Sequence, residues 1–168
     1  MRLYHYTAGE NLRGIFKEGL TAGDVPTDLK KFRGRIGVWF TTSTSAEGHG
    51  LDSGRLDKKR FRIAVDVPVS PLLVRWSEWA PKNVTAFTQI QLEMVTDRDS
   101  DYGDWWICFG WVRTEQIDHV VDMATGAVLP DWQHAWPEAT SLPGIPIRQR
   151  EAWHRRMLKE VKRELGRK

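Results

Sequence analysis

The sequence predicts an α+β fold with a mixed or antiparallel sheet. A strand-like segment at the N-terminus leads directly into an amphipathic helix, several strand-like segments then follow one another, and a second long helix closes the chain. Strands and helices therefore do not alternate, which argues against a doubly wound parallel sheet. The length of 168 residues, with 40% hydrophobic and 28% charged residues, predicts one globular domain over residues 1–168.

The first strand is predicted over residues 2–7. Side chains alternate across a strand, so His5 and Thr7 share one face while Tyr4 and Tyr6 share the other. An imidazole, a phenol and a hydroxyl, those of His5, Tyr6 and Thr7, therefore stand where the first strand meets the first helix. They serve either packing and capping or the binding of a ligand.

A helix is predicted directly after this strand. Thr7 and Glu10 fit a capping box, in which a hydroxyl and a carboxylate satisfy free N–H groups of the first turn. Four apolar residues lie near one face of this helix: Leu12, Ile15, Phe16 and Leu20. Gly19 can adopt the left-handed conformation that ends many helices.

The middle of the chain predicts strands separated by loops. In order, the prediction is a loop (21–36), a strand (37–43), a polar loop (44–59), a strand (60–68), a short helix or turn (71–84), a strand (88–95), a turn (97–104), a strand (105–112), a short strand (119–123) and an irregular segment (124–147). The segment 88–95 alternates, with Ile90, Leu92 and Met94 inward. The segment 105–112 is apolar on both faces, which is typical of a central strand that is covered on both sides.

The end of the chain, residues 148–168, predicts a basic amphipathic helix. It carries nine Lys/Arg and three Asp/Glu, a net charge of +6, so the other 147 residues sum to −3. Trp153, Met157, Val161 and Leu165 recur every four residues, which predicts an apolar stripe against the body of the protein. The charged face fits either a solvated surface or a polyanion such as nucleic acid as a partner.

Several classes of site find no support in the sequence. It contains no phosphate-binding glycine loop and no HExxH or GxSxG motif. The five histidines lack metal-ligand spacing and the single cysteine, Cys108, is expected to be buried filler, so no metal is expected. His49 with nearby Glu47 could transfer protons, or both could be solvated in their glycine-flanked loop. Without a secretory signal or a membrane-length apolar run, a cytoplasmic protein with no membrane partner is expected.

Four segments of the chain form an ordered pattern. They are "LYHYT" with the helix ending in Gly-Leu, then "GVWFTTS", "RFRIAVDVP" and "DWWICFGWVRTEQIDHVVDM". Together they resemble the ADP-ribosyltransferase-like superfamily, which includes diphtheria-toxin-like enzymes, poly-ADP-ribose polymerases, DNA-modifying ADP-ribosyltransferase toxins and RNA 2′-phosphotransferases. The resemblance covers about residues 2–123 and implies a split mixed or antiparallel sheet with NAD as a substrate.

The resemblance also implies roles for particular residues. In the family, the histidine of the first strand hydrogen-bonds a ribose hydroxyl of NAD, and His5 matches that position. A tyrosine in or after the second segment stacks on nicotinamide in the family, and Trp39 or Phe40 could do so here. The residues expected around NAD are His5, Tyr6, Arg35, Trp39, Phe40, Thr41, Thr42 and His49.

The catalytic carboxylate is where the sequence departs from the family. These transferases usually carry a glutamate near the start of a late strand, which favours the cationic state of the ribose as nicotinamide leaves. By register that position falls at Asp104 or Trp105. Asp104 is therefore the first choice for a catalytic carboxylate beside His5, with Glu93 and Glu115 as alternatives.

The expected function is NAD-dependent mono-ADP-ribosyl transfer to a macromolecule, and the basic tail slightly favours nucleic acid over protein as the acceptor. One alternative is an RNA 2′-phosphotransferase-like, nucleotide-processing enzyme, in which Arg33, Arg35 and Arg60 would bind phosphate. Another is a catalytically inactive module that binds a nucleotide or nucleic acid, which the missing glutamate favours.

Overall fold

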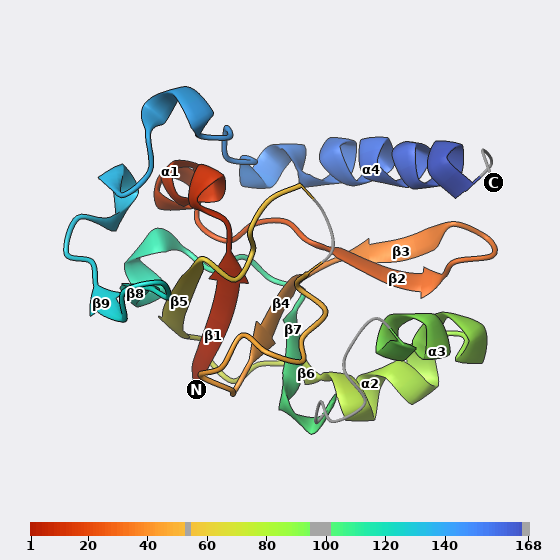
Figure 1. Cartoon of the computed structure of the whole chain (residues 1–168). Coiled ribbons are helices and arrows are strands. Elements are labelled where there is room, and N and C mark those ends of the chain that lie inside the picture. The colour runs from red at the N-terminus through yellow and green to blue at the C-terminus, as the bar shows by residue number, and fades with distance from the viewer. Residues whose placement is uncertain (53–54, 95–101, 166–168) are drawn as a thin grey trace.

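An antiparallel sheet forms the centre of the computed structural model, which describes residues 1–52, 55–94 and 102–165 (Figure 1). Its seven strands are ordered β6-β7-β4-β1-β5-β8-β9. Their bounds are Leu73–Arg75 (β6), Trp105–Cys108 (β7), Val38–Thr41 (β4), Arg2–Thr7 (β1), Phe61–Asp66 (β5), Ile117–Asp122 (β8) and Ala127–Val128 (β9). The pairings between these strands are antiparallel, so the protein is α+β, as the order of elements predicts.

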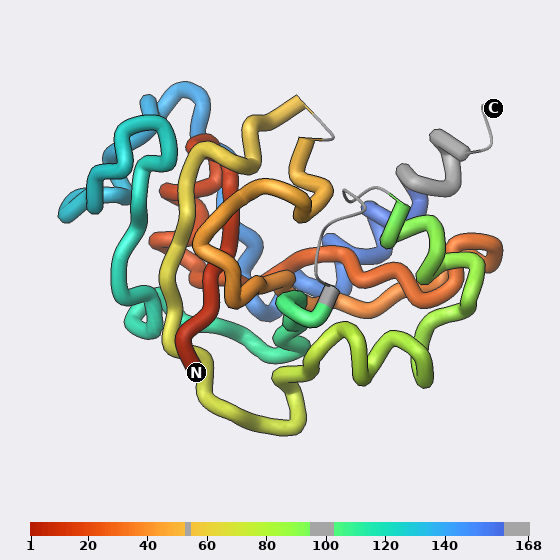
Figure 2. The backbone as a smooth tube through the Cα atoms, turned by 60° about the horizontal axis from the view of Figure 1, so that its bottom comes forward, coloured from red at the N-terminus to blue at the C-terminus, as the bar shows by residue number. Residues whose placement is uncertain are grey.

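Helices and a small second sheet surround the central sheet. Their bounds are Gly9–Glu18 (α1), Trp76–Asn83 (α2), Ala86–Met94 (α3), Arg150–Leu165 (α4), Asp24–Asp28 (β2) and Arg33–Ile36 (β3). The β2–β3 hairpin lies between α4 and the α2–α3 pair in Figure 1, with β3 against α4 and β2 against α3. Figure 2 shows the hairpin projecting on the side of the molecule away from β8 and β9.

Two apolar clusters hold the layers together. The larger packs α1 against the sheet face that carries Leu3 and Ile63. The smaller lies on the other face, where Trp76 of α2 packs on Trp105. Because Trp105 belongs to one cluster and Cys108 to the other, β7 is covered on both faces, as its sequence predicts.

The first helix forms as predicted but begins without the predicted capping box. Gly19 ends α1 with a φ of 75°, and its N–H donates to the Ile15 carbonyl. The N-cap residue is Ala8, and Thr7 Oγ1 instead accepts a hydrogen bond from Asn11 Nδ2 at 3.1 Å. The capping prediction is wrong because β1 runs through Thr7 and moves the start of the helix one residue along the chain.

Residues 21–36, predicted as a loop, contain the β2–β3 hairpin. Val25 is the one buried residue of its two strands, and Pro26 follows it within β2. A hairpin with a single buried residue has no alternation of apolar and polar side chains, so its sequence carried no strand signal.

Residues 88–95, predicted as a strand, belong to helix α3 as far as Met94. Thr88 is fully buried and Leu92 is partly buried, four residues further on, whereas Ile90 is 54% exposed. The alternation in the sequence therefore does not correspond to burial, and the inward residues follow the period of a helix.

The remaining predictions differ mainly in detail. The segment 71–84 forms β6 and α2. The turn predicted at 97–104 lies mostly outside the described residues, and Tyr102–Asp104 form a short 3-10 turn. The segment 124–147 holds β9 and short 3-10 turns.

Helix α4 packs on the body through a residue that the four-residue pattern did not include. Trp153 and Met157 are half-buried, whereas His154 is only 6% exposed. The side chains of Val161 and Leu165 are not among those that the structure describes. In the described part of the chain, no helix combines the length and the apolar character needed to span a membrane.

Candidate functional site

The central sheet is continuous, but β1 and β4 are paired at a single position, and we call this weakly paired place the division. β1 pairs with β5 along all six of its residues, but with β4 only through Tyr4 and Thr41. Figure 1 shows the two strands converging near the N-terminus and diverging toward the start of α1. In the divergent part, His5 Nδ1 donates a hydrogen bond to the Trp39 carbonyl at 2.9 Å. The halves β6-β7-β4 and β1-β5-β8-β9 are therefore joined here by one backbone pair and one side chain.

This hydrogen bond defines the chemistry of His5. A carbonyl oxygen only accepts, so Nδ1 carries the hydrogen and the neutral ring presents Nε2 as an acceptor. Burial lowers the pKa of His5; the Trp39 carbonyl opposes this shift and the charge of Lys58 adds to it. The residue is half-buried, and no group of the described residues hydrogen-bonds to Nε2. A neutral imidazole in this state can accept a hydrogen bond from a sugar hydroxyl.

Four aromatic rings meet across the division on the sheet face opposite α1. Tyr6 comes from β1, Trp39 from β4, Trp105 from β7, and His49 from the loop after β4. His49 stacks on Tyr6 with ring centroids 6.3 Å apart, and Trp39 meets Trp105 edge-on at 5.6 Å. The Trp105 indole N–H donates to His49 Nδ1 at 2.9 Å. These four residues, which we call the aromatic cluster, connect the two halves through a loop residue.

His49 is held in its neutral form. Burial lowers its pKa, and the Ser45 carbonyl and the Asp104 carboxylate oppose that shift. Because Nδ1 accepts the hydrogen bond from Trp105, the neutral ring carries its hydrogen on Nε2. His49 is therefore a neutral ring with one face on Tyr6, suited to stacking more than to proton transfer.

Asp104 stands beside the aromatic cluster, directly before Trp105. Thr42 binds it twice: its hydroxyl donates to Asp104 Oδ1 at 2.7 Å, and its backbone N–H donates to the Asp104 carbonyl at 3.1 Å. His5 points to the other face of the sheet, the one that carries Leu3 and Ile63, so a ligand that touches both Asp104 and His5 must reach through the division between β1 and β4.

Thr41 and Ser43 shape the loop that follows β4. Thr41 is 4% exposed, and its Oγ1 accepts a hydrogen bond from the Ser43 N–H at 3.0 Å. The Tyr6 hydroxyl donates to the Ser43 carbonyl at 3.4 Å. Thr41 thus helps to fix the backbone of the loop after β4, and this loop carries His49 to the aromatic cluster.

Two of the residues expected around NAD, Phe40 and Arg35, do not belong to the aromatic cluster. Phe40 is 3% exposed in the larger apolar cluster, where its ring meets His5 edge-on at 5.8 Å. The Arg35 guanidinium stacks on Phe109 at 3.8 Å from the ring centre. Of the aromatic side chains of β4, Trp39 is the one that reaches the aromatic cluster.

The alternative carboxylates lie on other elements. Glu93 lies on α3 and accepts a hydrogen bond from Gln89 at 2.9 Å. Glu115 lies, exposed, in the 3-10 turn before β8. Asp104 stays the first choice because it directly precedes Trp105 of the aromatic cluster.

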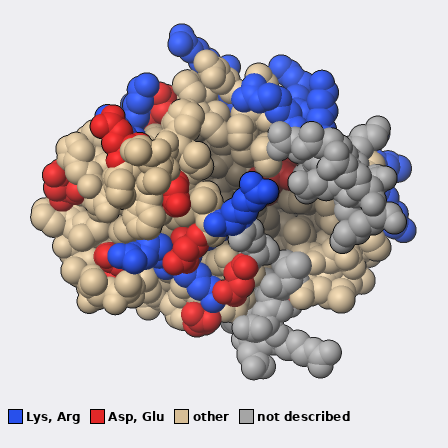
Figure 3. Space-filling view, turned by 45° about the horizontal axis from the view of Figure 1, so that its top comes forward, with Lys and Arg blue, Asp and Glu red and all other residues tan. Residues whose placement is uncertain are grey.

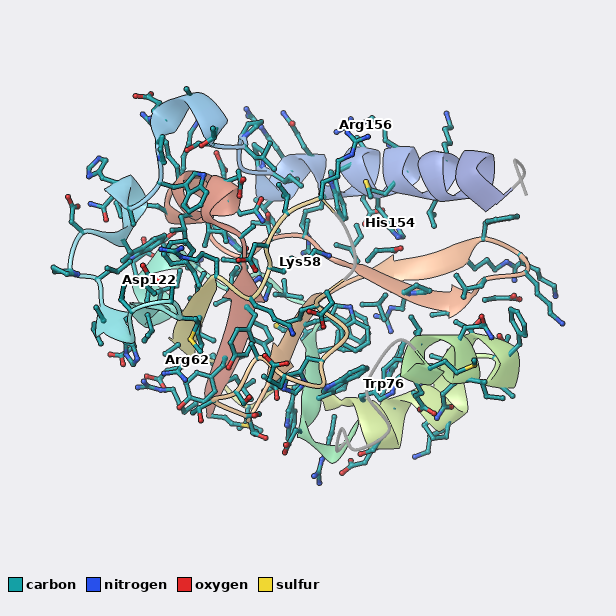
Figure 4. All side chains as sticks on the ribbon, viewed as in Figure 1. Lys58, Arg62, Trp76, Asp122, His154 and Arg156 are labelled. Carbon is teal, nitrogen blue, oxygen red and sulfur yellow. The ribbon has the colours of Figure 1, made fainter. Side chains whose placement is uncertain are left out.

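Two basic residues at the site, Arg62 and Lys58, were not predicted from the sequence (Figure 4). Arg62 of β5 pairs in register with Tyr6 and donates to the Thr44 carbonyl at 2.6 Å. Lys58, in the loop before β5, is close enough to His5 to influence its pKa. Arg62 follows the core residue Phe61 in β5, so its side chain points to the other face of the sheet. Nothing in the sequence shows that the loop after β4 folds onto this second face.

Comparison with other proteins adds no further evidence. No protein-family model matches the chain, and neither the curated proteins nor the solved structures contain a significant match. Within the described residues, no group of three or more His, Cys, Asp or Glu side chains is arranged to hold a metal ion. The site is therefore interpreted from its own geometry.

Proposed function

We propose that this protein binds NAD at the division between β1 and β4 and transfers the ADP-ribose part to a macromolecule. The observation that carries the proposal is the position of His5: it stands where the two sheet halves separate, with Nε2 left as an acceptor. A split sheet with a histidine of the first strand at the split is what the resemblance to the ADP-ribosyltransferase-like superfamily leads us to expect.

The reaction divides among three groups of this chain. His5 Nε2 accepts a hydrogen bond from a ribose hydroxyl and orients the sugar. The aromatic cluster offers ring faces to nicotinamide or adenine, and such stacking contributes about 1–3 kcal/mol per base. When the bond from C1′ to the nicotinamide nitrogen breaks, both electrons leave with nicotinamide, and the Asp104 carboxylate stabilises the positive ribose. An acceptor oxygen or nitrogen then bonds to C1′ and loses its proton.

Nucleic acid is the acceptor that the charge distribution favours. Arg155, Arg156 and Lys159 are exposed on α4, and no ion pair joins them to another described residue. Lys and Arg side chains gather at the top of the view in Figure 3, over this helix, and the same face is hollowed near its middle. Cations arranged along one helix face can track a phosphate backbone.

Two rival functions have weaker support. The contacts of the arginines speak against a phosphotransferase-like reaction, and one observation favours a binding module. A phosphotransferase-like reaction requires arginines beside His5. Arg60 instead pairs with Asp122 at 2.7 Å, Arg35 stacks on Phe109, and Arg62, the arginine at the site, donates to the Thr44 carbonyl. A binding module without turnover is favoured by Trp105, which stands at the start of β7 where a transferase would carry glutamate.

Incubation with NAD labelled in its ADP-ribose part, with RNA, DNA or lysate protein as acceptor, tests the proposal. We expect labelled macromolecule and free nicotinamide in equal amounts. Asp104→Asn should lower kcat about 10²–10³-fold, the loss typical for one charge-stabilising group, and leave the Kd for NAD within a few-fold. His5→Ala should weaken NAD binding itself, whereas His134→Ala, an exposed histidine, serves as the control.

The outcomes separate the rival functions. Saturable NAD binding without nicotinamide release, even at high enzyme concentration, would establish the binding module in place of the transferase. A protein that neither binds NAD nor releases nicotinamide would refute the proposal.

A further inference from the structure

Three hydrogen bonds connect the C-terminal helix to His5. His154 Nε2 donates to Asp24 Oδ1 at 2.9 Å. The Asp24 backbone carbonyl accepts a hydrogen bond from the Trp39 indole N–H at 2.9 Å. The Trp39 carbonyl in turn accepts the bond from His5 Nδ1 at 2.9 Å. These residues come from α4, β2, β4 and β1, and we call the four of them the tether.

The first link of the tether is enclosed. The His154 side chain is 8% exposed and that of Asp24 is 26% exposed. A Cβ atom on Gly34 would lie 3.2 Å from Asp24 Oδ1 and 3.5 Å from His154 Nε2, so glycine leaves the space that this pair occupies. Figure 4 shows His154 pointing from α4 toward the hairpin, while Arg156 points away from it. Removing one partner would leave a largely buried polar group unsatisfied.

The tether fixes positions and does not conduct protons. At Asp24 it passes from the carboxylate to the backbone carbonyl, and at Trp39 from the indole to the backbone carbonyl. These steps run through covalent bonds, so no continuous path for a proton exists. What each link constrains is the place of the next strand.

Trp39 is the residue through which this constraint reaches the site. Its indole is held by β2, its carbonyl holds His5, and its ring lies in the aromatic cluster beside Trp105. A shift of β2 therefore moves both the stacking surface and the acceptor that defines the tautomer of His5.

We propose that His154 and Asp24 are positioning residues of the nucleotide site, so that the docking of α4 on the hairpin sets the places of Trp39 and His5. Only the NAD readout of this inference rests on the proposed function. Helix α4 is then part of the framework of the site as well as a basic surface.

NMR without NAD provides the first test. Loss of one indole signal in Trp39→Phe identifies the Trp39 N–H. His154→Leu should then shift that signal, speed its hydrogen exchange and change the ¹⁵N signature of the His5 tautomer. His154→Gln, whose amide can still donate to Asp24, should restore the wild-type signals. Glu151→Leu, an exposed change on the same helix, should leave them unchanged.

NAD titration provides the second test. His154→Leu should weaken the Kd for NAD by about 2- to 30-fold, the range seen for residues that act on a site through others. His154→Gln should bind as the wild type does. Because Trp39→Phe already breaks the middle link, adding His154→Leu to it should cost less than in the wild-type background.

Distinct results would overturn this inference. A folded His154→Leu protein with wild-type signals from Trp39 and His5 would show that the tether does not constrain them. Shifted signals with an unchanged Kd for NAD would exclude a positioning role at the site. If the wild type does not bind NAD, the proposed function fails, and the NMR signals alone decide the inference. Should His154→Leu not fold, Asp24→Ala replaces it, with Asp24→Asn as the variant that keeps an acceptor oxygen.

Discussion

The environment of His5 links the site to the stability of the protein. Burial lowers its pKa below the ordinary 6.5, and burial has the same effect on His49. As the pH falls through about 6.5, the unfolded chain therefore binds more protons than the folded one. Stability rises with pH wherever the unfolded state binds more protons, so acidification lowers the free energy of unfolding. The loss begins near the unfolded pKa and is complete below the folded pKa.

Urea unfolding between about pH 7.5 and about pH 5.5, where unperturbed histidines titrate, measures this effect. We expect the free energy of unfolding to fall toward acid by up to about 1.4 kcal/mol per pH unit for each of the two histidines. His5→Gln should remove part of that slope, and His49→Gln a further part. His134→Gln, at an exposed position, should retain it. If the free energy of unfolding of the double variant, His5→Gln with His49→Gln, depends on pH as steeply as that of the wild type, this explanation is contradicted.

Individual site residues could be predicted from the sequence only where the strand pattern fixed them. The alternation in β1 predicted that His5 and Tyr6 point to different faces, and the register of β1 with β5 agrees with it. The meeting of His49 with Trp105 joins residues 56 positions apart. It depends on how a glycine-rich loop closes over the sheet, and no periodicity encodes that path.

At the scale of elements, α1 meets the segment before α4 at a pair of glycines. A Cβ atom on Gly144 would lie 2.5 Å from the Gly14 carbonyl oxygen and 2.5 Å from Glu18 Cγ. Gly144→Ala should therefore lower the free energy of unfolding by about 1–3 kcal/mol, the usual cost of overpacking. Gly110→Ala is the matched control, because its Cβ would meet its neighbours only at 3.4 Å or more. Denaturant unfolding compares the two variants, and equal stabilities would contradict the close approach of the two segments.

Elements were predictable where one face is buried over its full length. β1, β5 and α1 have such faces and were predicted with their types correct. The β2–β3 hairpin and α3 are short and bury few residues, so tertiary contacts decide their structure. In α3, Thr88 donates to and accepts from neighbouring groups at the start of the helix, which outweighs the strand-like alternation of the sequence.

At the scale of the whole molecule, the separation of charge predicts how an acceptor binds. Replacing Arg155, Arg156 and Lys159 with Gln should weaken RNA or DNA binding. It should also flatten the plot of log K against log salt by about 0.9 for each DNA phosphate that the variant no longer neutralises. The Kd for NAD should not change, because these side chains are exposed on α4.

The control for this prediction removes the same charge elsewhere. Lys17, Lys82 and Arg113 are also exposed and lie outside α4. Their replacement with Gln should leave the salt dependence near that of the wild type. Equal effects of the two triple variants would show that total charge, and not the α4 surface, determines binding.

The order of elements was sufficient to predict an α+β protein with a mixed or antiparallel sheet, because a chain without strand–helix alternation seldom forms an all-parallel sheet. The resemblance alone led us to expect a split sheet, without indicating between which strands, and the structure pairs β1 with β4 at one position. The hydrogen bond from the His5 side chain to the Trp39 carbonyl at this place is a tertiary contact that the local sequence does not specify.

The most direct test of the central claim is a structure of the protein in complex with NAD. We predict a ribose hydroxyl within hydrogen-bond distance of His5 Nε2, and a base stacked on a ring of the aromatic cluster. A complex in which NAD lies elsewhere, with both His5 and the cluster free of it, would contradict the claim.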